Sequence, residues 1–401
     1  MNPLKKIYCR CFQFAFRLAI PLMPYRKPQI FSTFSECVTE LKSLGVTSLL
    51  LVTDSFLRKS GVTAGLETLL QEAGIACHVY DGTKPNPTVQ NVEEATAMYR
   101  ANSCQALIAF GGGSSMDCAK ATGACVVYPK KSLAQMRGLL RVLRKLPPLV
   151  AIPTTAGTGS ETTVTAVITD PVEKHKYTMN NFTMIPRYAV LAPEVTYSLP
   201  AHLTATTGMD ALAHAVEAYI GGSTTKETRQ MALDATKLIF GNIKVAYDDG
   251  HNHAAREAML QAAYKAGVAF TQSYVGYIHA VAHTLGGQYG IPHGLANSVL
   301  MPVVLEKYGS AVYKKLHQMA VVGGVCLDSD SDEVAAKKFI QAIRDLNKYM
   351  NIPESFDAIR EEDIPHMVSY AEKEANPLYP VPVLMDKNEL EYFYRAVMSQ
   401  S

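Results

Sequence analysis

The sequence predicts a fold in two parts: an α/β domain built on a parallel sheet, followed by an all-α domain. Through the first half, short apolar runs alternate with helical patterns, which is typical of a parallel sheet with helices on both faces. After about residue 200 the pattern changes to long Ala/Leu-rich stretches with few strand signals. A chain of 401 residues can hold two such domains, which we expect at residues 1–199 and 200–401.

The strands predicted for the first half are short, apolar and bounded by turn residues. A helical pattern over residues 89–100 separates two of them. Strands joined through helices form a Rossmann-like parallel sheet, because parallel neighbours need crossover connections. The predicted strands span residues 47–53, 75–80, 105–110 and 149–152.

We expect the first 30 residues or so to form an extension of the α/β domain. Basic residues precede an apolar run at 11–23, which Gln13 and Arg17 interrupt. The run is too short and too polar to span a bilayer, and no small-x-small cleavage site follows it. We expect an amphipathic segment that packs on the domain or on a partner subunit.

Composition narrows the possible partners and the compartment. Charged residues make up 18% of the chain and the net charge is +2, so the basic field of a nucleic-acid-binding protein is missing. The eight cysteines show no C-x-x-C framework, which favours a reducing, cytoplasmic location. We expect neither a nucleic-acid partner nor a membrane span.

Five residues with regular spacing predict a metal site. Asp210 and His214 are four apart in an Ala/Leu-rich helical run, and His279 and His283 repeat that spacing. Residues four apart share one helix face, so each pair can bind one ion from consecutive turns. A Gly-Ile-Pro turn then leads to His293. A carboxylate with several imidazoles and no thiolate suits Fe(II), Zn or another divalent first-row metal.

Each part of this pattern also has a simpler explanation. An isolated Asp-x-x-x-His pair is usually a surface ion pair, and the His-x-x-x-His pair lacks the Glu of a metalloprotease helix. His293 alone would be an ordinary loop histidine. Together the histidines lie in small, apolar surroundings where unpaired polar rings are unfavourable, and this favours the metal.

A glycine-rich turn follows the predicted strand at 105–110. Gly111, Gly112 and Gly113 lead into an Ala-rich helix, and such a turn directs backbone N–H groups at a phosphate. Ser114 and Asp117 have the spacing of a capping box, which predicts the start of the helix. A tight turn without a ligand explains the glycines about as well.

Two further segments carry polar groups suited to a nucleotide. The hydroxyl-rich loop after the strand at 149–152 offers Thr154, Thr155, Thr158 and Ser160. Asp54, at the end of an early strand, could accept hydrogen bonds from a ribose 2′-hydroxyl and would repel a 2′-phosphate. Its alternative role is to cap the next helix.

These motifs together resemble the iron-containing (group III) alcohol dehydrogenase family, in that family's order and over about residues 30–390. The resemblance implies a dehydroquinate-synthase-like α/β domain and a helical metal-binding domain. The motifs are Gly-Gly-Gly-Ser with Asp117 and Lys120, Pro-Thr-Thr-x-Gly-Thr-Gly-Ser-Glu at 153–161, Gly-Met-Asp-Ala-Leu-x-His-Ala-x-Glu-Ala-Tyr at 208–219, His-x-x-x-His-x-Leu-Gly at 279–286 and Pro-His-Gly-x-x-Asn at 292–297.

The resemblance also implies roles for individual residues. It assigns Asp210, His214, His279 and His293 as metal ligands and His283 as an additional active-site histidine. It favours NAD over NADP because an Asp stands at position 54. The cofactor-binding residues are then Asp54, Asn86, Gly111, Gly112, Gly113, Ser114, Asp117, Thr154, Thr155, Thr158, Ser160 and Lys176.

The function implied is that of an NAD-dependent alcohol dehydrogenase acting on a small primary alcohol or aldehyde, with catalytic Fe(II) or, alternatively, Zn. A homodimer or higher homo-oligomer is expected. Two alternatives stay open. The first is another enzyme of the same fold, such as a dehydroquinate-synthase-like lyase or a glycerol-dehydrogenase-like dehydrogenase of polyols or phospho-polyols. The second is a non-enzymatic sensor of a metal or a nucleotide. Measuring whether the protein reduces NAD in the presence of alcohols would distinguish these three possible functions.

Overall fold

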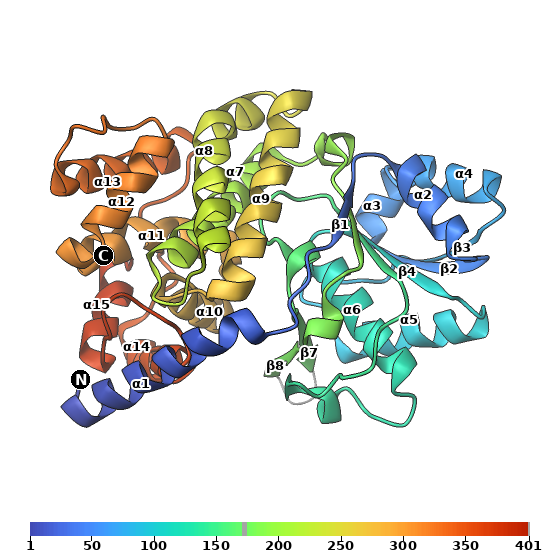
Figure 1. The fold of residues 1–401 in the computed structure, drawn as a ribbon, viewed down its shortest axis with the longest axis horizontal. Coiled ribbons are helices and arrows are strands. Elements are labelled where there is room, and N and C mark those ends of the chain that lie inside the picture. The colour runs from blue at the N-terminus through green and yellow to red at the C-terminus, as the bar shows by residue number, and fades with distance from the viewer. Residues whose placement is uncertain (171–174, 400–401) are drawn as a thin grey trace. The chain divides into compact units, whose positions relative to one another are not determined.

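The computed structural model describes residues 1–170 and 175–399, without the side chains of residues 175 and 176, and the chain forms two compact units (Figure 1). One unit is Pro24–Ser198; the other combines Met1–Met23 with Leu199–Ser401. The first is an α/β unit and the second is helical, so the predicted fold class is confirmed.

The α/β unit is built on a six-stranded parallel sheet with the strand order β1-β9-β6-β4-β2-β3. All five neighbouring pairs are parallel, as the alternation of strands and helices predicted. The strands are β1 (Gln29–Phe31), β2 (Ser48–Val52), β3 (Ala76–Tyr80), β4 (Ala106–Gly111), β6 (Leu149–Pro153) and β9 (Tyr188–Val190).

A smaller sheet, which the sequence did not predict, adds three strands in the order β5-β8-β7. Strands β7 and β8 pair antiparallel, and β5 pairs parallel with β8. Their polar and β-branched residues lack the continuous apolar character of the central strands. They are β5 (Gly138–Leu139), β7 (Thr165–Asp170) and β8 (His175–Asn180).

Helices cover both faces of the large sheet, because its central strands are apolar on both sides. Leu49 and Leu51 face one hydrophobic core with helices α2 and α4, whereas Leu50 and Val52 face the other with α5 and α6 (Figure 1). The helices are α2 (Phe34–Ser43), α3 (Ser55–Lys59), α4 (Ala64–Glu72), α5 (Val89–Ala101) and α6 (Gly113–Val127), with 3₁₀ turns η2 (Ala134–Met136), η3 (Ser160–Thr162), η4 (Phe182–Met184) and η5 (Pro193–Thr196).

The helical unit packs long helices directly against one another. Helices α7, α8 and α9 lie side by side (Figure 1). Its helices are α7 (Ala201–Ile220), α8 (Lys226–Asp248), α9 (His253–Ser273), α10 (Tyr277–Tyr289), α11 (His293–Tyr308), α12 (Tyr313–Val322), α13 (Asp332–Tyr349), α14 (Ile364–Ala375) and α15 (Lys387–Ala396), with 3₁₀ turns η6 (Gly309–Ala311) and η7 (Glu361–Asp363).

The N-terminal segment differs from its expected place. The sequence grouped it with the α/β domain, whereas the structure places Met1–Met23 in the helical unit. It forms helix α1 (Pro3–Ala19) and the 3₁₀ turn η1 (Ile20–Leu22). The reason is a set of polar contacts: Arg10 and Gln13 donate hydrogen bonds to backbone carbonyls of residues 377–382.

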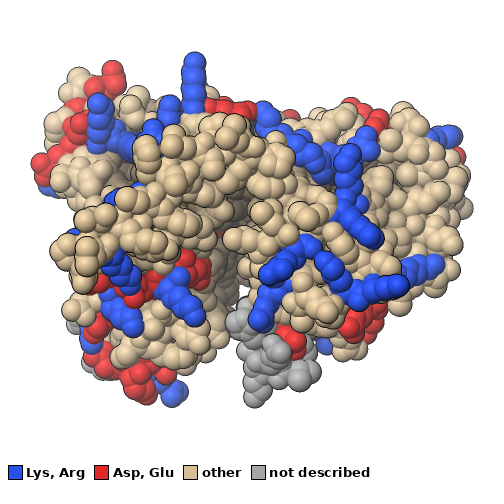
Figure 2. Space-filling model, turned by 60° about the horizontal axis from the view of Figure 1, so that its bottom comes forward, with Lys and Arg blue, Asp and Glu red and all other residues tan. Residues whose placement is uncertain are grey.

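Charged residues make up 18% of the chain. Figure 2 shows acidic and basic side chains on one face, between larger uncharged areas. Among the residues that the structure describes, no helix is both long enough and apolar enough to cross a membrane.

Candidate metal centre

Three helices of the helical unit bring the candidate ligands together. Asp210 and His214 lie on consecutive turns of α7, and His279 lies in the first turn of α10. Helix α10 ends at Gly290, whose φ of +69° is the left-handed conformation that glycine adopts readily. His293 is then the first residue of α11, so the predicted turn does lead this imidazole back.

The four side chains form one compact cluster. One ligand atom each from Asp210, His214, His279 and His293 lies within 4.8 Å of all the others. Asp210 Oδ1 is 3.5 Å from His293 Nε2 and 3.9 Å from His279 Nε2. All but His293 are buried. Nitrogen and oxygen atoms this close around one point are spaced as the ligands of a single ion would be.

Glu217 orients His279 toward that cluster. It lies seven residues after Asp210 on α7, and its Oε2 is 2.6 Å from His279 Nδ1. Its Oε1 accepts a hydrogen bond from the backbone of Ile278 at 2.8 Å. Burial lowers the pKa of His279 well below its usual value, so the ring is neutral. With Nδ1–H donating to Glu217, the Nε2 lone pair is left for a metal.

Asn297 lies at the middle of the same cluster. Its Nδ2 is 2.7 Å from Asp210 Oδ1, 3.1 Å from His279 Nε2 and 3.2 Å from His293 Nε2. Its Oδ1 is buried without a hydrogen-bond partner in the described part of the chain. The amide nitrogen of Asn297 therefore lies among three of the four candidate ligand atoms and donates to the Asp210 carboxylate.

The donor set fits a divalent first-row metal. One carboxylate and three imidazoles suit Fe(II) and Zn equally well by ligand type. The Asn297 amide has two hydrogens for the three ligand atoms beside it, so it cannot satisfy them all in this buried cluster, and a cation would. A protein that holds an ion through side chains and leaves a coordination position open has the arrangement of a catalytic site.

His283 lies beside the cluster but is not one of its four members. Its ring stacks on that of His293 with centroids 5.2 Å apart, and its Nδ1 is 2.6 Å from Glu374 Oε1. Glu374 also accepts a hydrogen bond from the Tyr379 hydroxyl at 2.7 Å. Burial is the largest single influence on the pKa of His283 and lowers it, but the charge and hydrogen bond of Glu374, together with the charges of Glu217 and Asp210, raise this pKa overall.

Gly294 keeps α11 close enough to α7 for His293 to meet Asp210. A methyl group on Gly294 would lie 2.4 Å from the Thr206 carbonyl oxygen.

We expect Gly294→Ala to displace α11 and to weaken metal binding by about tenfold or more, the scale seen when supporting contacts are lost. Metal content after dialysis measures this. Gly287→Ala is the control, because nothing lies within 4 Å of its added carbon; equal metal retention in both variants would contradict the account.

In the α/β unit, the glycine turn opens directly onto a helix. Helix α6 begins at Gly113 with Gly112 as its N-cap and, within the described residues, no side chain caps it. The predicted capping box of Ser114 and Asp117 is therefore wrong, because the helix starts before Ser114. Gly111 has a φ of +152°, and a methyl group there would lie 2.4 Å from Ser115 Oγ. An uncapped N-terminus leaves N–H groups available to a phosphate.

The hydroxyl-rich loop lies against this turn. The Thr154 amide donates to the Gly111 carbonyl at 3.1 Å. A methyl group on Gly112 would lie 3.4 Å from Thr155 Oγ1, and one on Gly113 would lie 3.3 Å from Thr158 Cγ2. The backbone amide of Asn86 donates to Ser114 Oγ at 3.3 Å. These predicted residues therefore converge at the carboxyl ends of β4 and β6.

Asp117 and Ser160 make contacts within the protein. Asp117 accepts hydrogen bonds from Ser160 Oγ at 3.3 Å and from the Val167 amide at 3.1 Å. Lys120 is fully buried and donates to the carbonyl oxygens of Ser160, Thr163 and Thr165 at 2.7–3.1 Å. This small buried network holds the end of the hydroxyl-rich loop.

Asp54 caps α3, the alternative role considered for it. Its Oδ1 accepts hydrogen bonds from the amides of Phe56 and Leu57, each at 2.9 Å. This role leaves its second oxygen for other partners. Lys176 lies in β8 opposite Thr169, but its side chain falls outside the described part of the structure.

Several residues that support the site were not identified from the sequence. Glu217 and Asn297 had a usable signal, since each continues the helical spacing of a candidate ligand, at Asp210 plus seven and His293 plus four. Glu374 and Tyr379 had none, because they come from a distant segment, α14 and the stretch after it.

Comparisons with known proteins cover nearly the whole chain. Residues 30–193 match the family model described as iron-containing alcohol dehydrogenase, and residues 204–398 match that of the Fe-containing alcohol dehydrogenase family, C-terminal. The chain is 38% identical to a 1,3-propanediol dehydrogenase of Klebsiella pneumoniae over 365 residues, which are 90% of this chain and 93% of the relative.

Two further similarities agree with these. The chain is 38% identical to an NAD-dependent methanol dehydrogenase of Bacillus methanolicus, over 82% of this chain and 87% of the relative. A crystal structure of a 1,3-propanediol oxidoreductase superposes with a TM-score of 0.89 and 36% identity, covering 93% of this chain and 98% of that one.

Proposed function

The chain belongs to the iron-containing alcohol dehydrogenase family, and from this premise we propose that it is an NAD-dependent alcohol dehydrogenase acting on a small primary alcohol or its aldehyde. One observation carries the proposal: a carboxylate and three imidazoles converge within 4.8 Å in a largely buried cluster. The names of the similar propanediol and methanol dehydrogenases support the substrate class, and the second also supports NAD.

Asp210, His214, His279 and His293 would hold the ion, for which we propose Fe(II), with Zn as the alternative that the same donors suit. A bound divalent metal would polarise the substrate oxygen as a Lewis acid, and NAD would accept the hydride. Glu217 keeps Nε2 of His279 unprotonated for this purpose through its contact with Nδ1.

We propose that His283 relays the proton of the alcohol. Its contact with Glu374 places a proton on Nδ1, which leaves Nε2 as the acceptor. The Tyr379 hydroxyl fixes Glu374 in turn. This chain of contacts orients the ring and balances its charge when a second proton is taken up, as general-base work requires.

The cofactor would bind through the α/β unit. The turn of Gly111, Gly112 and Gly113 with the uncapped start of α6 would receive the pyrophosphate. Asp54 would meet the ribose. Supporting contacts would come from Asn86, Ser114, Thr154, Thr155, Thr158 and Lys176, while Asp117 and Ser160 would hold the loop in place.

We also propose a homodimer or higher homo-oligomer in a cytoplasmic setting. All eight cysteines are free in the structure, which suits a reducing compartment. Burial raises the pKa values of Cys37, Cys77 and Cys118 to about 12, so these three thiols are poorly reactive.

Absorbance at the reduced-nicotinamide band tests the activity. The protein, purified without oxygen and supplied with Fe(II), is given NAD with a panel of primary alcohols, diols and polyols, and NADH with the matching aldehydes. We expect NADH formation with small primary alcohols and the reverse reaction with their aldehydes. No turnover with any of them, or turnover with polyols alone, would contradict the proposed substrate class.

Cofactor choice is tested at Asp54 without disturbing α3. Asparagine caps helices as well as aspartate does, so Asp54→Asn keeps the cap and removes the charge. We expect the efficiency with NADP relative to NAD to rise about tenfold, which corresponds to about 1.4 kcal/mol of relieved repulsion. Asp54→Ala removes the cap together with the charge, so it should change the cofactor ratio in the same direction and also lose about 1 kcal/mol of stability. If the ratio of the efficiencies with NADP and NAD is unchanged in Asp54→Asn, Asp54 caps α3 and does not select the cofactor.

A further inference from the structure

Helix α1 has two different faces, and only one packs on the protein. Cys9, Gln13 and Ile20 are 1%, 6% and 7% exposed, and the ring of Phe16 meets that of Tyr274 edge-on at 4.9 Å. These positions follow a spacing of four and three, so they form one face of the helix. This inner face is narrow and accounts for the docking of α1.

Polar contacts fix the helix in that orientation. Gln13 Nε2 donates to the Tyr379 carbonyl at 2.7 Å. Arg10 donates to the carbonyls of Val381 and Pro382, each at 2.8 Å. Lys5 pairs with Glu372 at 2.7 Å. These contacts orient α1 so that its inner face is buried on the helical unit and its outer face stays exposed.

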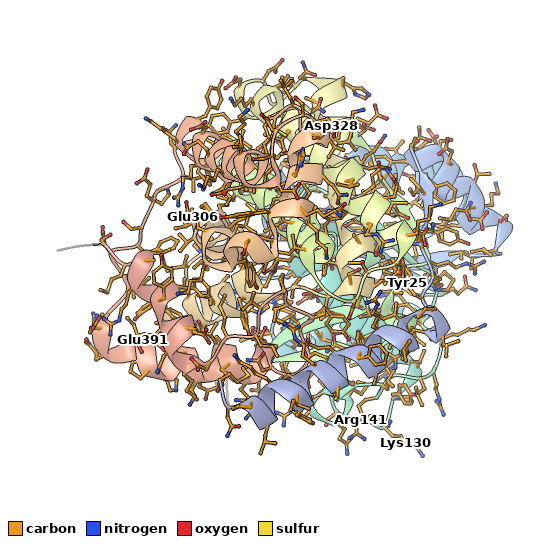
Figure 3. All side chains as sticks on the ribbon, turned by 60° about the vertical axis from the view of Figure 1, so that its left-hand side comes forward. Tyr25, Lys130, Arg141, Glu306, Asp328 and Glu391 are labelled. Carbon is orange, nitrogen blue, oxygen red and sulfur yellow. The ribbon has the colours of Figure 1, made fainter. Side chains whose placement is uncertain are left out.

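The outer face nevertheless carries large apolar side chains. With the exposed Cys11 they recur at intervals of three and four from Leu4 to Leu22 at the end of η1, and Tyr8 lies beside them. Figure 3 shows α1 in blue beside the red C-terminal helices with side chains directed away from them. Such exposed stripes mark interaction surfaces, because they are otherwise unfavourable in water. Their exposed fractions are Leu4 75%, Ile7 61%, Tyr8 59%, Phe14 62%, Leu18 62% and Leu22 86%.

The stripe continues into a groove on the helical unit. A groove of about 450 Å³ is lined by Ile7 and Cys11 of α1 and by Pro382, Val383 and Leu384. Lys6 and Arg10 stand at the same groove. Apolar surface and cationic groups therefore adjoin one another here.

Charge on this segment has a single sign. The first acidic residue of the chain is Glu36, so α1 contains none. Lys6 and Arg17 lie along one flank of the apolar stripe, and Arg10, which lies between them on the same flank, is held by the carbonyls of Val381 and Pro382. Long cationic side chains beside an apolar face can extend to phosphate groups while the face is buried.

We propose that the outer face of α1 binds an anionic lipid surface, with the helix lying parallel to it. A basic amphipathic helix with aromatic and aliphatic residues on one side is suited to the headgroup boundary of a membrane. A second copy of this chain fits less well, because it would bring two acid-free basic helices together. Residues 1–29 also precede the segments that match the family models, so this face is an addition to the catalytic fold.

Cosedimentation of the whole protein with vesicles tests the proposal. We expect binding to vesicles of phosphatidylcholine with phosphatidylglycerol, little binding to phosphatidylcholine alone, and release toward 1 M salt, where the Debye length is about 3 Å. The double variant Lys6→Gln, Arg17→Gln should lower the partition coefficient about 30-fold, because each cation near the membrane surface contributes about 1 kcal/mol of binding free energy. Lys130→Gln with Lys145→Gln is its control and should bind as the parent does.

A matched pair of triple variants tests the apolar face itself. Changing Ile7, Phe14 and Leu18 to Glu should reduce vesicle binding to background. Changing Leu139, Leu143 and Leu327 to Glu adds the same charge at side chains that are 63%, 69% and 68% exposed, and should not. Equal loss in both triple variants would contradict the proposal, since it would then reflect overall charge.

The chain contains no tryptophan, which allows a direct optical probe. In Phe14→Trp we expect emission to shift to the blue with anionic vesicles, while Tyr370→Trp, at a site that is 56% exposed on α14, should not shift. Absence of the shift with no vesicle binding overturns the proposal. A second result would also overturn the proposal. If the parent protein binds no vesicles and the Ile7/Phe14/Leu18 variant loses self-association in light scattering, the stripe joins copies of this chain.

Discussion

Replacing His293 by Ala is expected to abolish alcohol-dependent NAD reduction and to leave the protein without its metal. His293 is the first residue of α11, and its Nε2 lies 3.5 Å from Asp210 Oδ1, within the four-member cluster. Its side chain is 38% exposed, so its loss leaves no large cavity, and the buried Asp210 carboxylate keeps its hydrogen bond from Asn297. The fold should therefore survive, and metal analysis after dialysis, with circular dichroism on the same sample, measures both effects.

His202→Ala provides the control, since His202 is an exposed residue of the same helix as Asp210 and lies outside the cluster. It should keep metal and turnover. Full metal occupancy in His293→Ala would remove His293 from the ligand set, even if turnover fell.

Replacing His283 by Ala should leave metal and cofactor binding intact and lower turnover about a hundredfold, the scale of a positioned acid–base group. His283 shares a helix face with His279, yet the four-member cluster does not include it and its Nδ1 is engaged by Glu374. Single-turnover hydride transfer, followed by absorbance, separates this loss from changes in substrate affinity.

Glu374→Gln is the informative companion, because it preserves a hydrogen-bonding group and removes the charge that supports His283. We expect a smaller loss of turnover with the metal retained. If His283→Ala loses its metal as His293→Ala does, His283 belongs among the ligands and the relay proposal is wrong.

Helical periodicity allowed much of the metal cluster to be predicted. A spacing of four residues places Asp210 beside His214, and the Gly290–Pro292 turn returns the chain to His293. The sequence spacing predicts the spatial arrangement here because these residues lie within regular helices or next to a helix end that is capped by glycine. The parallel sheet was predictable for a similar reason, since each central strand is apolar on both faces.

Contacts between distant segments could not be predicted in this way. Glu374 reaches His283 from 91 residues away, and nothing in either local pattern indicates the pair. The capping box at Ser114 was wrong because Gly112 and Gly113 start α6 earlier than a side-chain cap would. The position of α1 depended on hydrogen bonds to carbonyls of residues 377–382, which carry no sequence signal.

Stoichiometric metal restoration is the most direct test of the central claim that this cluster holds a catalytic ion. Protein stripped by a chelator without oxygen is titrated with Fe(II), or with Zn(II) in parallel, while NAD reduction by a small primary alcohol is followed. The account predicts no activity without metal and a linear recovery that saturates at about one ion per chain, absent in His293→Ala. Full alcohol-dependent NAD reduction by the metal-free protein would contradict it.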